Sequence, residues 1–219
     1  KEEKSFKYLI NKLLNTIDTK AKVNNQILFF VDDQLVYKPI NLGKINKLLK
    51  NSFLTTFRFG SNTKYSFNLN KKQNIKNYNY KFENNIFQWS PTFKRDDLSY
   101  LFSFDASTIP YDLFKLFAKK LIYKGPNSLE SAMNYNNYLY KLLNLKTSSL
   151  ESQSAVNLVI SIAQKETINR GNFKDLDYLL NIYENDWRLK LDANIISRIN
   201  GPHIDFGGIL IRKGEIRNV

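Results

Sequence analysis

Apolar and polar residues alternate with different periods along this chain, and the pattern predicts both helices and strands. Over residues 4–17 the apolar positions recur every three or four residues, as in a helix with one buried face. Two apolar runs at 27–31 and 35–37 flank a short polar segment, which is typical of a hairpin. Between residues 53 and 93 Tyr and Phe alternate with polar residues, and this alternation predicts strands.

From about residue 109 the spacing of apolar residues becomes helical. The Gly125-Pro126 pair ends the first of these helices, because Gly suits a left-handed cap and Pro cannot continue a helix. Ser128 is expected to cap a second helix, whose Tyr135 would share a core with the first. A third helix is expected over residues 150–164 and a fourth amphipathic segment near 173–187.

The end of the chain differs again, since residues 189–197 and 209–217 have the pattern of strands separated by glycine-containing turns. We therefore expect an α+β fold with two domains. Residues 1–100 would form an N-terminal extension of mixed helix and strands. Residues 105–219 would form a helical domain that ends in a protruding antiparallel β-ribbon over 193–219.

The charge balance points to a polyanionic partner. The chain has 33 Lys and Arg residues against 20 Asp and Glu residues, which leaves a net charge of +13. Such an excess favours binding to nucleic acid, with an anionic membrane surface as the competing interpretation. The richness in Asn, Lys, Ile, Phe and Tyr is also typical of an AT-rich genome, such as that of an organelle, which tempers the charge argument.

Basic and aromatic residues are interleaved between residues 64 and 95, a combination that suits stacking on unpaired bases. The alternative, that these aromatic residues form the inner face of a small sheet, stays open. We expect no membrane partner, because no segment approaches the roughly 20 apolar residues that a spanning helix needs.

Most catalytic chemistry is excluded by composition. The chain has no Cys and a single His, so thiolate metal sites, a Cys nucleophile and a multi-His metal site cannot form within it. No phosphate-binding glycine loop, nucleophile elbow or metal-ligand spacing occurs. His203 and Asp205 could face the same side of a strand, but an RNA-contacting role suits a lone His better than a general base. We expect no enzymatic activity, no cofactor and no metal.

The helix–glycine–helix unit resembles the universal small-subunit ribosomal protein seven family. The positions that carry this resemblance are Leu113, Phe117, Leu121, Gly125, Ser128 and Tyr135, followed by Leu150-Glu151 at the start of the expected third helix. Ser197-Arg198 and the segment ILIRKGEIRN then resemble the two strands of the family's β-ribbon. The order and spacing of these three elements carry the likeness.

The chain also departs from that family. Pro126 and Asn127 replace two Lys residues, Ile199 replaces the second Arg of the ribbon, and residues 164–192 resemble an insertion. The family's last three helices have no counterpart, so a second fragment that supplies them is one expected partner. A rival resemblance is to small-subunit ribosomal protein three, whose Arg-x-Gly turn is similar to Arg212-Lys213-Gly214.

The first resemblance implies a structural role in the small ribosomal subunit. The protein would bind the 3′ major domain of the small-subunit rRNA in the head, beside neighbouring ribosomal proteins and near exit-site tRNA and mRNA. Its location would be the mitochondrial matrix, with a plastid as the alternative. The residues expected to contact RNA are Lys115, Lys119, Lys120, Lys124, Arg198, Gly201, Pro202, His203, Arg212, Lys213 and Arg217. Gly201, Pro202, His203 and Asp205 would form the ribbon tip.

Two functions from other classes stay open at this point. One is a plasmid- or virus-type nucleic-acid-binding accessory protein, and the other is a structural subunit of an organellar membrane complex. Sedimentation that depends on intact RNA separates the ribosomal role from both.

Overall fold

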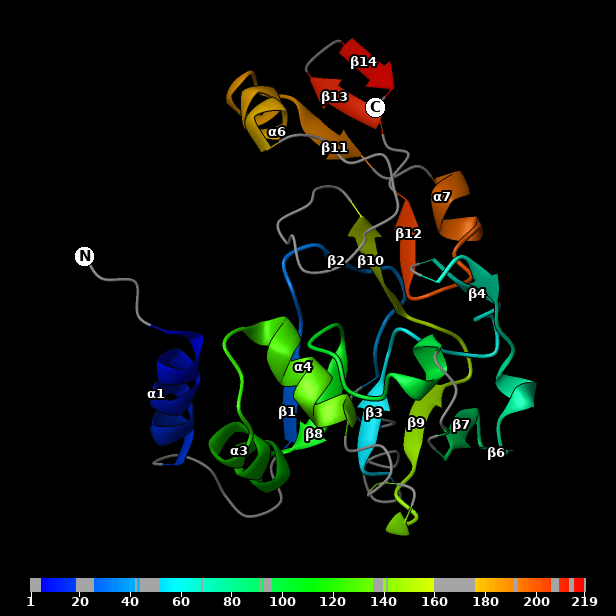
Figure 1. Ribbon diagram of the computed structural model, residues 1–219. Helices are drawn as coiled ribbons and strands as arrows, with labels where there is room; N and C mark the ends of the chain where they lie inside the picture. Colours follow the sequence, from blue (N-terminus) through cyan, green and yellow to red (C-terminus); the bar gives the residue numbers. More distant parts are fainter. Residues whose placement is uncertain are drawn as a thin grey trace.

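Helices and strands occur together in the computed structural model, so the expected α+β fold is confirmed (Figure 1). The structure describes residues 5–18, 26–41, 43, 52–67, 69–90, 92, 96–135, 140, 142–159, 176–190, 193–205, 209–212 and 215–218.

The largest element is a six-stranded sheet with the strand order β1-β8-β3-β9-β7-β6. Its strands are β1 (Gln26–Phe29), β3 (Leu54–Thr56), β6 (Tyr80–Glu83), β7 (Ile86–Trp89), β8 (Ser107–Pro110) and β9 (Thr147–Leu150). The β3–β9 pair is parallel and the other pairs are antiparallel. Strands from both sides of residue 100 therefore share this sheet, across the expected domain limit.

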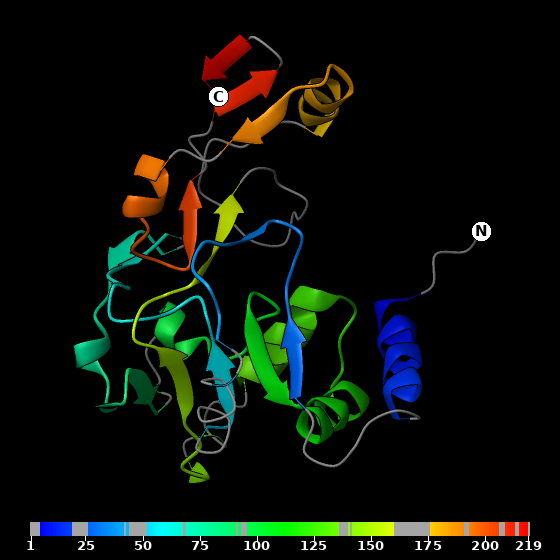
Figure 2. The same cartoon turned by 180° about the vertical axis from the view of Figure 1, so that it is seen from behind.

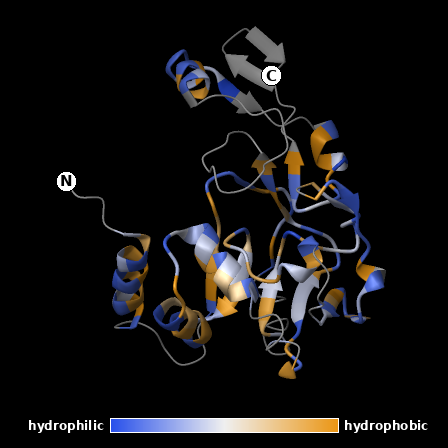
Figure 3. Ribbon diagram, in the orientation of Figure 1, coloured by the Kyte–Doolittle hydropathy of each residue, from blue (hydrophilic) through white to orange (hydrophobic). Residues whose placement is uncertain are grey.

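Three helices lie beside the β1–β8 side of the sheet: α1 (Phe6–Asp18), α3 (Tyr111–Lys120) and α4 (Pro126–Tyr135) (Figures 1 and 2). Figure 3 shows hydrophobic and hydrophilic residues alternating around α1 and α3, as expected of helices that bury one face. The buried residues that these helices contribute to the main core include Ile10, Leu14, Phe114, Ala118, Leu129 and Met133. Phe102 and Phe104 complete an aromatic cluster with Phe114 at centroid distances of 5.2–6.4 Å.

The start of α4 shows how local sequence sets a helix boundary. Pro126 occupies the first helical position, where a missing N–H costs no hydrogen bond. The Ser128 hydroxyl accepts hydrogen bonds from the backbone N–H groups of Lys124 and Gly125, each at 2.9 Å. Ser128 thus stabilises the turn from within the helix, two residues after its start. Tyr135 was expected in the core, but it is 94% exposed, so this prediction is wrong.

The remaining described elements form smaller units. One three-stranded sheet has the order β12-β10-β2, and another has the order β11-β13-β14. Their bounds are β2 (Gln34–Val36), β10 (Ala155–Val159), β11 (Arg188–Lys190), β12 (His203–Asp205), β13 (Ile209–Arg212) and β14 (Glu215–Asn218). A short pair consists of β4 (Tyr65–Ser66) and β5 (Lys71–Lys72). The other helical segments are η1 (Ile75–Asn77), η2 (Asp97–Ser99), α6 (Leu176–Glu184) and α7 (Ala193–Ser197).

The helix expected over residues 150–164 is wrong, because strand β9 ends at Leu150 and β10 occupies Ala155–Val159. Strand β10 pairs on one edge with β2 and on the other with β12. A short apolar run has the same appearance in a buried strand and in a buried helix, and here pairing on both edges decides the structure.

The expected ribbon is also corrected by the structure. Residues 193–197 form helix α7, and β13 pairs instead with β11 and β14. Ile195 and Ile199 are both buried at a spacing of four residues, which is helical spacing on a segment that the sequence pattern assigned to a strand.

Candidate functional site

The exposed lysines at the C-terminal end of α3 are the first candidate site. Lys119 and Lys120 lie in the last turn of the helix, and Lys124 lies four residues beyond it. All three side chains are exposed, and none has an ion pair within the described part of the chain. Lysines in the last turn also interact favourably with the helix dipole, so part of their role is local. The sequence prediction expected all three side chains on the polar side of a helix that ends at Gly125-Pro126, but the helix ends at Lys120 and Lys124 lies outside it.

Lys115 differs from these three lysines because it has a partner within the protein. Its Nζ donates hydrogen bonds to both carboxylate oxygens of Asp18, at 2.7 and 2.6 Å. This hydrogen bond holds the pKa of Asp18 below its ordinary value. Lys115 therefore links α3 to α1, and its contact with RNA stays a prediction.

Two of the residues expected at a protruding ribbon tip lie inside the protein. Gly201 and Pro202 are buried, and a Cβ on Gly201 would overlap the Tyr65 carbonyl oxygen. The Gly201 carbonyl accepts a hydrogen bond from Gln153 Nε2 at 2.6 Å, and the Pro202 carbonyl accepts one from the Asn157 N–H at 2.9 Å. The prediction of a protruding tip is wrong, because β12 pairs with β10 and this segment is therefore part of a sheet.

The predicted arginines are distributed over separate elements. Arg198 is exposed after α7, and its Nε donates to the Asn194 carbonyl at 3.2 Å. The backbone of Arg212 lies on β13 and that of Arg217 on β14, while Lys213 lies outside the described residues. These residues lie on or beside elements other than α3, and their contact with RNA stays a prediction.

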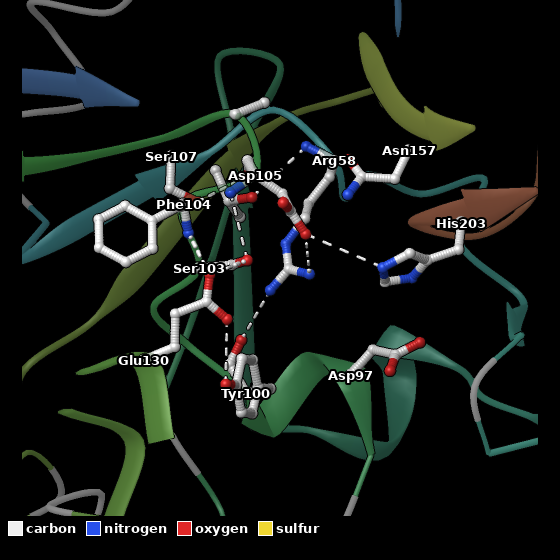
Figure 4. Close-up of polar contacts among 12 residues, drawn as sticks. Arg58, Asp97, Tyr100, Ser103, Phe104, Asp105, Ser107, Glu130, Asn157 and His203 are labelled. Carbon is white, nitrogen blue, oxygen red and sulfur yellow. Dashed lines mark hydrogen bonds and ion pairs between the residues drawn. The ribbon is translucent and has the colours of Figure 1, made fainter. Parts of the chain in front are cut away.

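A buried charge cluster, which we define as Arg58, Asp105, Glu130 and His203, is the second candidate site (Figure 4). The Arg58 side chain is 3% exposed, and its Nη1 lies 3.8 Å from Asp105 Oδ2. Its Nη2 donates to the Tyr100 carbonyl at 3.1 Å. His203 Nε2 lies 3.8 Å from the same Asp105 oxygen.

Glu130 projects into this cluster from α4 and accepts three hydrogen bonds. Its Oε1 accepts from the Phe104 N–H at 2.6 Å and from Ser103 Oγ at 3.0 Å, and its Oε2 accepts from Tyr100 Oη at 3.1 Å. Burial, with a smaller contribution from the nearby Asp105 charge, raises the pKa of Glu130 to about 7. Donation by Phe104 opposes this change but does not outweigh it.

Burial also lowers the pKa of His203, although the negative charge of Asp105 opposes the effect. A separation of 3.8 Å exceeds hydrogen-bonding distance, so His203 and Asp105 do not form an oriented proton-transfer pair. Within the described residues, no group of three or more His, Asp or Glu side chains could hold a metal ion. The cluster brings together Arg58 just after β3, Asp105 just before β8, Glu130 on α4 and His203 on β12.

The sequence prediction missed this cluster because its members lie at positions 58, 105, 130 and 203. No local motif links them, and only the pairing of β12 with β10 brings His203 to Asp105.

Comparison with family models, curated proteins and solved structures gives no match to this chain. Among the residues that the structure describes, no helix has the length and apolar character required to cross a membrane.

Proposed function

We propose that this protein is a structural constituent of a small ribosomal subunit, most simply a mitochondrial one, and that it binds the small-subunit rRNA. The observation that carries this proposal is the exposed group Lys119, Lys120 and Lys124 at the end of α3. None of these ammonium groups forms an ion pair within the described residues, although Lys119 is close enough to Asp18 to help lower its pKa, and the full sequence has a net charge of +13. Phosphate is the anion that best compensates them, because each contact releases condensed counterions from RNA.

The structure retains only part of the likeness to ribosomal protein seven that supports this proposal. The third helix and the two-stranded ribbon that resembled ribosomal protein seven are replaced by strands and by α7. The α3–Gly125–α4 unit of that resemblance remains. The rival likeness to ribosomal protein three expected a turn at Arg212-Lys213-Gly214, and β13 and β14 pair antiparallel on either side of Lys213 and Gly214.

The proposal therefore names the small ribosomal subunit as the particle, and which ribosomal protein family the chain represents stays a prediction. By the first likeness the site is the 3′ major domain of the rRNA in the head, near exit-site tRNA. Neighbouring proteins of the head would be further partners. The proposed role requires no catalytic group, cofactor or metal.

Sedimentation tests the proposal most directly. We expect the tagged full chain to migrate with the small subunit in a sucrose gradient, and to leave that fraction after RNase treatment. Migration that survives RNase would indicate a protein or membrane partner and would overturn the proposal.

A charge variant tests the observation that carries it. Changing Lys119, Lys120 and Lys124 together to Gln should reduce the slope of log affinity against log salt by roughly 2–3 for an rRNA-domain fragment, if each lysine meets one phosphate. Lys72→Gln removes an exposed lysine from β5, away from α3, and is the matched control. Equal slopes for all three proteins would contradict the role of the α3 lysines.

A further inference from the structure

A shallow, open hollow of about 500 Å³ lies at the end of the six-stranded sheet where β3 and β9 begin. Its lining residues include Ser52, Phe53, Lys81, Gln88, Asn144 and Lys146. This volume falls within the range of roughly 300–1,000 Å³ that is usual for ligand sites. None of these residues belongs to the α3 lysines or to the buried charge cluster.

The parallel pairing of β3 with β9 creates the hollow. It places the segments that precede the two strands side by side, and the Phe53 N–H donates to the Lys146 carbonyl at 2.9 Å. Asn144 has a φ of 51°, a left-handed turn conformation that Asn adopts readily, just before Lys146. Strands β6 and β7 form the other wall, where Lys81 is directly opposite Gln88.

The lining combines three kinds of chemistry. Lys81 and Lys146 supply positive charge, while Gln88 and Asn144 supply amide groups that can both donate and accept. Gln88 Nε2 donates to Ser52 Oγ at 3.0 Å, which orients the amide. Phe53 also lines the hollow, and its ring packs against Tyr140 with centroids 4.8 Å apart, which fixes its position.

We propose that this hollow binds one nucleotide of a single-stranded RNA segment. The two ammonium groups compensate phosphate, the Phe53 ring supports the base, and the amides contact the base edge. An unpaired nucleotide fits this set because its base can leave the stack and rest on an aromatic side chain. This inference deepens the proposed function and rests on it.

The open form of the hollow favours a segment of a longer chain over a free nucleotide. A free ligand of this size is usually enclosed over most of its surface, whereas a nucleotide within RNA must leave room for the chain on both sides. Two ring contacts, Phe53–Tyr140 and Phe117–Tyr140, also connect the hollow to α3.

Glu83 provides an internal competitor for the bound phosphate. Its carboxylate pairs with Lys81, but the two side chains are 58% and 65% exposed, so the pair is weak and replaceable. Lys81 holds the pKa of Glu83 below its ordinary value, and Glu83 is therefore ionised at neutral pH. Removing this carboxylate should strengthen RNA binding at the hollow.

The test measures binding of fluorescein-labelled hexauridylate to the full chain by fluorescence anisotropy over a range of salt concentrations. Lys81→Gln combined with Lys146→Gln should lower the salt slope by about 1.4, since each phosphate contact on a single strand contributes about 0.7. Glu83→Gln should tighten binding, and Lys72→Gln should leave the site unchanged apart from a small general charge effect. An unchanged thermal midpoint confirms that each variant is folded.

The outcomes separate this inference from the proposed function. If the α3 variant weakens binding to the rRNA fragment but the hollow variant behaves like Lys72→Gln with hexauridylate, the hollow proposal is overturned and the proposed function stands. If the wild-type chain binds neither RNA, both are overturned. Photocrosslinking of 5-iodouridine to a peptide that contains Phe53 would support the hollow. Displacement of hexauridylate by polyglutamate at equal charge concentration would assign the hollow to acidic peptides and overturn the proposal.

Discussion

Charged side chains occupy two contrasting settings in this protein. In the buried charge cluster, Arg58 pairs with Asp105, donates a hydrogen bond to the Tyr100 carbonyl and partly offsets the rise that burial causes in the pKa of Glu130. All of these partners belong to the chain itself. At the end of α3, Lys119 and Lys120 are exposed and have no ion pair within the described residues. Folding supplies the carboxylate and carbonyl partners of Arg58, although Arg58 Nε and His203 Nδ1 have no hydrogen-bond partner within the described residues. The exposed lysines remain available to an external anion.

This difference separates charges that stabilise the fold from charges that are available for recognition. A buried cation without its carboxylates would cost several kcal/mol, so its partners must be built in. An exposed lysine without an ion pair stays hydrated and destabilises the fold little, so it is available to bind another molecule. Substitutions in the buried charge cluster should therefore lower stability, whereas substitutions of the exposed lysines should lower RNA affinity.

The largest effect is expected at Arg58. Replacing Arg58 with Met keeps much of the side-chain volume but leaves Asp105 buried without its cation, which should lower the free energy of unfolding by about 3–5 kcal/mol. Urea denaturation followed by circular dichroism measures the change. Arg188→Met is the matched control, because Arg188 pairs with Asp186 at the surface and should cost about 1 kcal/mol or less. Equal losses for the two variants would remove the distinction between the settings.

Glu130 should give the next largest effect, and its sign depends on pH. Its pKa is raised in the folded state to about 7 from an ordinary value of 4.5, so the protonated form is favoured by folding. The resulting stability is fully present below pH 4.5 and is lost as pH rises through about 7. Each pKa unit corresponds to about 1.4 kcal/mol, so the loss amounts to roughly 3 kcal/mol.

Glu130→Gln should remove this pH dependence, because the amide cannot ionise. The free energy of unfolding of the variant, measured between pH 5 and pH 8, should change less than that of the wild type. His203 acts in the opposite direction, since its lowered pKa reduces stability only when the pH falls below its ordinary value of 6.5. Parallel curves for wild type and variant would show that Glu130 is ionised throughout.

The Lys115–Asp18 pair lies between the two settings and should have a smaller effect. Both side chains are about one-third exposed, so the ion pair is screened by water. Asp18→Asn should lower the free energy of unfolding only slightly, and 1 M salt should reduce the difference between wild type and variant. A loss as large as that of Arg58→Met would place this pair with the buried cluster.

The smallest effect on stability is expected for the α3 lysines. Changing Lys119, Lys120 and Lys124 together to Gln should alter the free energy of unfolding by less than about 0.5 kcal/mol, as for other exposed positions. Thermal denaturation checks this expectation on the same protein that is used for RNA binding. A large destabilisation would mean that these lysines support the helix end and that their effect on RNA affinity is indirect.

The sequence predicted best those elements whose information is local. The apolar spacing in α1 and α3 identified both helices, because one face of each packs on the core. The apolar pattern of β10 predicts a helix, but residues 155–157 pair with residues 34–36 and residues 157–159 pair with residues 203–205. Contacts between residues so far apart in the sequence do not change the apolar periodicity of a short segment.

The candidate sites divide in the same way. The exposed lysines of α3 could be found from the polar face of a predicted helix. The buried charge cluster could not, because Arg58 and His203 lie 145 positions apart and meet only through Asp105. Gly201 illustrates the limit, because a glycine expected at an exposed turn is required instead by close approach to Tyr65.

The central position of β10 also has a consequence for the order in which the chain can fold during synthesis. Residues 155–157 can pair with β2 as soon as β10 leaves the ribosome, but the other edge of β10 waits for residues 203–205. A nascent chain that ends before β12 therefore carries an open strand edge, which is a template for association with another chain. Translation of the last part of the protein closes that edge, so a pause between β10 and β12 is the interval in which premature aggregation is most favoured.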